Sequence, residues 1–116
     1  MRILFVINDP PYGTERCFNA FRLALAILKD QEKPEISVFL MADAVVCAKA
    51  GQKTPDGYYN LEQMIKGVVR DAKVVLCGNC MDARGIKDGE LVAGATRGTM
   101  PQLARLTLAA DKVLVF

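Results

Sequence analysis

Histidine is absent from this chain of 116 residues. Its absence excludes Ser-His and Cys-His catalysis, and it excludes every metal site that uses an imidazole ligand. An excess of charge of one sign is missing as well, because 15 basic and 13 acidic residues leave a formal net charge of +2. A protein without a basic stripe is poorly suited to neutralise a phosphate backbone, so we expect no direct nucleic-acid partner.

Long hydrophobic runs are also lacking. No apolar segment approaches the roughly 20 residues that span a bilayer. The residues from Met1 onward show neither the apolar region nor the cleavage site of a signal peptide. We therefore expect a cytoplasmic protein with no membrane partner, in which the four cysteines are reduced thiols and not a disulfide framework.

The length and composition predict one folded domain over residues 1–116, since 52% of the residues are hydrophobic and 24% are charged. The mean hydropathy of +0.19 is high for a small protein. An apolar surplus on a small surface is typical of subunit interfaces, so we expect a homo-oligomer.

Apolar segments alternate with helical patterns along the chain. Strands are predicted at residues 2–8, 36–41, 72–77, near 92–96 and 112–116. Helices are predicted after three capping residues, Thr14, Asn60 and Thr99, and a short helix is predicted over residues 42–49. This alternation predicts an α/β fold with a mainly parallel sheet and helices on both faces.

In such sheets the functional crevice lies beyond the carboxyl ends of the strands, which places residues 8–15, 41–43 and 77–85 there. Tyr12, Glu15 and Asp43 are therefore candidate binding residues, although Glu15 better suits compensation of a helix dipole and Asp43 equally suits a helix cap. Residues 9–15 match neither G-x-G-x-x-G nor a P-loop, so no nucleotide cofactor is predicted.

A C-x-x-C pair, Cys77 and Cys80, stands at the end of the third predicted strand. Gly78 or Asn79 begins a helical turn, and a thiol at a helix N-terminus has its pKa lowered from about 8.5 toward neutrality. Arg84 adds positive charge if it folds back. Thiolates attack sulfur well, so the pair favours persulfide transfer or thiol–disulfide exchange.

The four cysteines admit several other interpretations. Cys17 and Cys47 lie on predicted helices and are expected to pack in the core. A Cys₄ zinc site is disfavoured because such sites use two close pairs, whereas these two stand alone. Thioredoxin-type oxidoreduction is disfavoured because the C-x-x-C follows two βα units. The open hypotheses are a sulfur carrier, a non-catalytic oligomeric scaffold, and a redox sensor that uses Cys77 and Cys80.

Several segments resemble the DsrE/DsrF-like family, and within it the small YchN-like proteins. They are Pro11-Tyr12-Gly13 with Glu15, residues 39–45, Gly51-Gln52-Lys53, Leu76-Cys77 with Cys80 and Arg84-Gly85-Ile86, and residues 109–114. The resemblance implies a three-layer α/β/α sandwich with a five-stranded, mainly parallel sheet, and assembly into rings or stacked trimers. It also implies cytoplasmic sulfur handling as a cysteine persulfide, with donor and acceptor proteins as partners.

The resemblance also ranks the site residues. The transferring cysteine of those relatives ends the equivalent strand and precedes an Arg-Gly, which corresponds to Cys77. Cys80 departs from the pattern, because persulfide carriers commonly lack a second thiol. The predicted site needs no metal and no cofactor. Its catalytic residues are Cys77, Cys80 and Arg84, and its binding residues are Gly78, Asn79, Gly85, Tyr12, Glu15 and Asp43.

Overall fold

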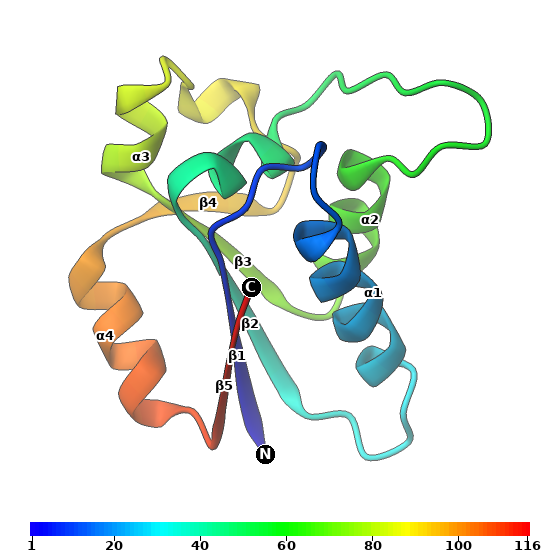
Figure 1. The fold of residues 1–116 in the computed structure, drawn as a ribbon. Coiled ribbons are helices and arrows are strands. Elements are labelled where there is room, and N and C mark those ends of the chain that lie inside the picture. Colours follow the sequence, from blue (N-terminus) through cyan, green and yellow to red (C-terminus); the bar gives the residue numbers. More distant parts are fainter.

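A computed structural model describes all 116 residues. One sheet of five strands has the order β4-β3-β2-β1-β5, and every neighbouring pair is parallel (Figure 1). The strands are β1 (Arg2–Ile7), β2 (Glu35–Leu40), β3 (Lys73–Cys77), β4 (Ala95–Gly98) and β5 (Lys112–Val115). The predicted α/β class and the five-stranded parallel sheet are confirmed.

Helices cover the two faces of the sheet unequally. They are α1 (Arg16–Leu28), η1 (Ala42–Ala48), α2 (Leu61–Val68), α3 (Gly78–Ala83), η2 (Asp88–Glu90) and α4 (Met100–Ala109), where η denotes a 3₁₀ helix. Figure 1 shows α1 and α2 on one face and α4 alone on the other, which gives three layers. None of these helices combines the length and the apolar character needed to cross a membrane.

Burial differs between the two faces because one helix cannot cover what two can. The core beneath α1, α2 and η1 contains 23 buried residues, including the fully buried Phe5 and Phe21. The core beneath α4 contains only Leu4, Phe39, Val75 and Leu103. The face that carries α4 therefore keeps part of its apolar surface open to solvent.

Two predicted helix caps are confirmed and one is wrong. Asn60 accepts a hydrogen bond from the backbone N–H of Gln63, and Thr99 accepts one from Gln102. Thr14 does not cap α1, because its hydroxyl donates to Asp9 at 2.9 Å and Glu15 occupies the N-cap without a side-chain hydrogen bond.

The fourth strand begins later than its predicted position near residue 92. Gly94 adopts φ +94° and turns the chain before Ala95, so pairing with β3 runs from Ala95 to Gly98. Gly98 lies opposite Cys77, and a Cβ there would overlap the side chain of Val75. This shift places the end of β4 directly beside the end of β3.

Candidate functional site

Cys77 occupies the junction between β3 and α3. It is the last residue of the strand and the N-cap of the helix, and its Sγ accepts a hydrogen bond from the backbone N–H of Cys80 at 3.3 Å. Gly78 follows at once, and a Cβ at Gly78 would lie 2.9 Å from Arg97 Nη1. The carbonyl oxygen of Gly98 would lie 3.2 Å from the same Cβ, so the glycine lets the end of β4 and the Arg97 side chain lie close to the half-buried thiol.

Cys80 receives a backbone hydrogen bond from another segment of the chain. The N–H of Ala42, the first residue of η1, donates to Cys80 Sγ at 3.2 Å. Ala42 is the only residue other than glycine with a positive φ, at 52°. Such a conformation is costly for alanine and is retained where surrounding contacts enforce it. Each thiol of the pair therefore accepts a hydrogen bond from a backbone N–H group.

The prediction that the helix N-terminus lowers the pKa of Cys77 is wrong. Burial raises the pKa of Cys77 above its ordinary value, and a hydrogen bond with the Cys80 thiol raises it further. Hydrogen bonds from the backbone N–H groups of Cys80 and Asn79 lower this pKa but do not overcome the burial. Cys77 is thus mainly a protonated thiol at neutral pH, with donors in place for its thiolate.

Arg84 and Asp43 come together, although they lie 41 residues apart in the sequence. Arg84 Nε and Nη2 donate to Asp43 Oδ1 at 3.0 and 2.8 Å, and Arg84 Nη1 donates to the carbonyl oxygen of Cys80 at 3.1 Å. Asp43 lies inside η1 and is not its N-cap, which is Met41. The pair ties the end of α3 to the start of η1, and Gly85 then ends α3 with φ +66°.

Arg97 is a residue of this site that the sequence reasoning missed. Its three guanidinium nitrogens donate to the carbonyl oxygen of Gly78 at 3.1 Å, to Asp82 Oδ1 at 2.9 Å and to Asp88 Oδ1 at 2.7 Å. These bonds fix α3 against the end of β4. A basic residue next to a glycine in a weakly predicted strand carries no signal for this role.

A cavity of about 310 Å³ opens beside Cys77. It is lined by Cys77, Gly78, Asn79, Arg97, Gly98, Thr99, Met100 and Pro101. Its size is at the lower end of small-molecule sites. The half-buried Cys77 thiol therefore lies in the wall of a hollow that a small sulfur compound or the end of a peptide can enter.

Tyr12 and Glu15 lie in another part of the structure. The Tyr12 hydroxyl donates to Gln52 Oε1 at 2.6 Å and accepts the N–H of Leu61 at 3.1 Å, and burial raises its pKa. Tyr12 thus fastens the loop before α2, while Glu15 is exposed at the start of α1. The structure brings residues 41–43 and 77–85 together at one edge, and it places residues 8–15 beside α1 and that loop.

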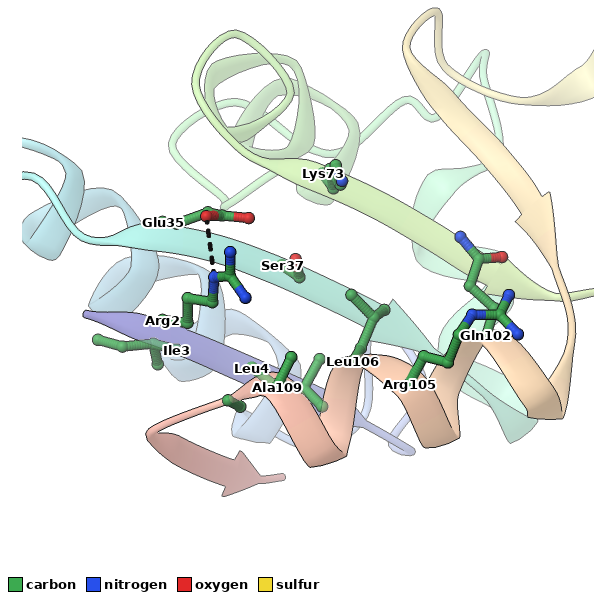
Figure 2. A pocket seen from close by; sticks show the side chains of 11 residues that line it. Arg2, Ile3, Leu4, Glu35, Ser37, Lys73, Gln102, Arg105, Leu106 and Ala109 are labelled. Carbon is green, nitrogen blue, oxygen red and sulfur yellow. Dashed lines mark hydrogen bonds and ion pairs between the residues drawn. The ribbon is translucent and has the colours of Figure 1, made fainter.

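The largest cavity, about 380 Å³, lies at the opposite end of the sheet. Figure 2 shows Arg105, Gln102 and Leu106 of α4 around it, with Arg2 paired to Glu35 at 3.3 Å. It contains no cysteine and borders the starts of β1, β2 and β3. Of these two cavities, only the 310 Å³ cavity has a cysteine in its wall.

No group of three or more cysteine, aspartate or glutamate side chains is close enough to hold a metal ion. The cysteines form two separate pairs, Cys77 with Cys80 and Cys17 with Cys47, whose sulfur atoms lie 3.0 Å apart. Both members of the second pair are fully buried. Cys17 and Cys47 pack in the core as predicted, but they do not stand alone.

These features define a three-layer α/β protein with a half-buried thiol at the end of an inner strand. The chain belongs to the DsrE/DsrF-like family, whose sequence model matches residues 1–116. It is 42% identical to Protein YchN of Escherichia coli strain K12 over 116 residues, covering 99% of this chain and 98% of YchN. It is 34% identical to the uncharacterized protein MJ0989 of Methanocaldococcus jannaschii, covering all of both chains.

Solved structures agree with this assignment. The crystal structure of the ychN protein from E. coli superposes with a TM-score of 0.94 at 42% identity, covering 99% of this chain and 98% of that one. A protein of unknown function from Methanobacterium thermoautotrophicum, MTH1491, has a TM-score of 0.77 at 15% identity, covering 97% of each chain. The second likeness shows the shared fold alone.

Proposed function

We propose that this protein carries sulfane sulfur as a persulfide on Cys77 and passes it between a donor and an acceptor protein in the cytoplasm. Membership of the DsrE/DsrF-like family supports this function. The observation that carries it is the position of Cys77, which ends β3 beside the 310 Å³ cavity and accepts the N–H of Cys80. Backbone donors at that point stabilise negative charge on sulfur.

Loading the carrier is a transfer without net oxidation. The Cys77 thiolate attacks the outer sulfur of a donor persulfide, so that a new S–S bond forms on Cys77 and the S–S bond of the donor breaks. The donor leaves as a thiolate and takes up a proton. The backbone N–H groups of Cys80 and Asn79 donate to Cys77 Sγ, which carries the negative charge before the attack.

Unloading has two routes that differ in the use of Cys80. An acceptor nucleophile can attack the outer sulfur directly and return Cys77 as a thiolate. Alternatively, the Cys80 thiolate attacks Cys77 Sγ, forms the Cys77–Cys80 disulfide and expels the outer sulfur as hydrosulfide. The second route needs an external thiol to reduce the disulfide. Ala42 supplies its N–H to Cys80 Sγ and so supports Cys80 as an attacking thiolate.

The test is intact mass spectrometry after anaerobic incubation with a persulfide donor. We expect an adduct of about 32 Da on the wild type. The adduct disappears in Cys77→Ser and accumulates in Cys80→Ser, because the second route is then closed. A wild-type protein that gains no sulfur, or a Cys77→Ser variant that gains as much as the wild type, would contradict the proposal.

The exposed apolar side chains on the face of the sheet that carries α4 support assembly into a homo-oligomer, of which a trimer or a hexamer is the predicted form. Leu108 of α4 is 87% exposed, and Val115 of the edge strand β5 is 67% exposed. Val115 pairs with Val6, which contacts the small core beneath α4, so Val115 lies on this same face of the sheet. Apolar side chains gathered on one incompletely covered face are typical of subunit interfaces.

Light scattering coupled to size exclusion tests this assembly. We expect the Leu108→Asp/Val115→Asp variant to dissociate to monomers. A matched control is Leu23→Asp, because Leu23 is 40% exposed on α1 at the other face and its substitution leaves the assembly intact. A monomeric wild type would overturn the prediction.

A further inference from the structure

The second cysteine pair joins two elements that are distant in the sequence. Cys17 lies in the first turn of α1 and Cys47 lies near the end of η1, and neither side chain is exposed to solvent. Their Sγ atoms are 3.0 Å apart. Cys47 has one other hydrogen-bond partner, the carbonyl oxygen of Asp9, at 4.0 Å. Each thiol therefore has the other thiol as its nearest polar partner.

The two sulfur atoms lie near enough for a disulfide to form after a small movement. A disulfide has an S–S length of about 2.05 Å, so the two sulfur atoms must approach by about 1 Å. We propose that Cys17 and Cys47 are a redox modification site, at which a peroxide oxidises the two thiols to a disulfide that ties α1 to η1. This site is independent of sulfur carriage by Cys77.

The reaction balances with hydrogen peroxide as the oxidant. One sulfur attacks a peroxide oxygen, so that an S–O bond forms, the O–O bond breaks, and water leaves with the thiol proton. The second thiol then attacks the resulting sulfenic sulfur, forms the S–S bond and expels a second water. The two sulfurs together lose two electrons, and the peroxide gains them.

The consequence of the bond follows from the position of η1. This element carries Cys47 near its end and Ala42 at its start, and Ala42 donates its N–H to Cys80 Sγ. A Cys17–Cys47 bond closes a loop of about 30 residues and restrains η1 against α1. A Cys77–Cys80 bond would close only one turn of α3. Oxidation of Cys17 and Cys47 therefore stiffens the segment that donates a hydrogen bond to the half-buried pair.

Burial makes the reaction depend on local opening. It strongly raises the pKa of Cys47, so the thiol is protonated and shielded in the closed protein. Peroxide reaches the pair only when α1 or η1 transiently separates. We therefore expect slow oxidation in buffer and faster oxidation at urea concentrations below the unfolding midpoint.

The experiment uses the Cys77→Ser/Cys80→Ser variant, which retains only the buried pair. After incubation with hydrogen peroxide, the protein is denatured in the presence of N-ethylmaleimide and weighed. We expect a product about 2 Da lighter that takes no alkylating reagent and yields a crosslinked peptide pair. Its melting temperature should rise by about 10 °C, and a thiol reductant should reverse both changes.

The matched control adds Cys17→Ala to the same variant, which leaves Cys47 without a partner and should abolish the mass loss and the shift in melting temperature. The proposal is overturned if both buried thiols of the first variant still react with N-ethylmaleimide. It is equally overturned if they gain oxygen without crosslinking, or if the crosslinked protein melts no higher than the reduced one. Should the double serine variant not fold, peptide mapping of the oxidised wild type gives the same decision.

Discussion

The two cysteine pairs of this protein are made from the same residue type and have opposite surroundings. Cys77 and Cys80 are half-buried and lie within one helical turn of each other. Cys77 accepts a hydrogen bond from the backbone N–H of Cys80, and Cys80 accepts one from the backbone N–H of Ala42. Cys17 and Cys47 are fully buried and face each other across two elements. Solvent access and backbone hydrogen-bond donors thus distinguish the two pairs. The thiols of the first pair can exchange with a partner protein, whereas those of the second can react only with each other.

The largest expected difference is in the rate of alkylation. We expect Cys77 to react with iodoacetamide faster than Cys17 and Cys47 by on the order of a thousandfold, because the buried thiols must wait for local opening. Time-resolved peptide mass spectrometry of the native protein measures the three rates separately. In denaturant the rates should converge, and similar rates in the native protein would remove the distinction between the pairs.

The next effect is the pH dependence of Cys77. Because its pKa is raised by burial, the thiolate fraction is small at neutral pH and increases as the pH rises. The alkylation rate should therefore increase about tenfold per pH unit and keep rising above pH 8.5, the approximate ordinary pKa of the thiol. In Cys80→Ser the rise should level off at lower pH, since the thiol–thiol hydrogen bond is lost. A wild-type plateau below pH 8 would indicate a lowered pKa instead.

Cysteine-to-serine substitutions measure how much free energy of unfolding is lost when a hydroxyl replaces a thiol in each pair. Cys47→Ser places a hydroxyl in the apolar core and should lower the free energy of unfolding by about 2 kcal/mol. Cys80→Ser should lower it by less than about 1 kcal/mol, because the Ala42 N–H can donate to a hydroxyl at this half-buried position. Urea denaturation of both variants measures the difference, and equal costs would argue that burial does not distinguish the pairs.

The last comparison concerns the wall of the cavity beside Cys77, where the change in the alkylation rate should be small. A Cβ at Gly98 would overlap Val75 and lie 2.6 Å from Gln102 Oε1, so Gly98→Ala should cost about 1–2 kcal/mol and alter the alkylation rate of Cys77. Gly89→Ala is the matched control, because no atom lies within 4 Å of a Cβ there. If Gly98→Ala leaves both the stability and the alkylation rate unchanged, this wall of the cavity can adjust to a Cβ.

Much of the fold could be predicted from the sequence because its signals are local. Unbroken apolar runs identified β1, β2 and β3 to within one or two residues. The capping residues Asn60 and Thr99 were identified from spacing alone. Thr14 does not cap the helix because its hydroxyl donates a hydrogen bond to Asp9, which lies outside the helix.

The site was predictable only in part, since its residues come from several segments. The position of Cys77 at a strand end followed from the apolar run before it. The role of Arg97 depends on β4 lying beside β3, and the donation by Ala42 depends on η1 meeting α3. No local pattern encodes either contact. The pKa of Cys77 was misjudged for the same reason, because burial is set by neighbours from other elements.

The sequence by itself determined the α/β class, the order of elements, and the absence of imidazole chemistry, since composition and periodicity act along the chain. Tertiary structure decided which cysteines meet. Cys77 and Cys80 were a visible pair from the start because they are three residues apart. Cys17 and Cys47 became a pair only when α1 and η1 packed on the same face of the sheet, because 30 residues of chain separate them and only packing brings their sulfur atoms together.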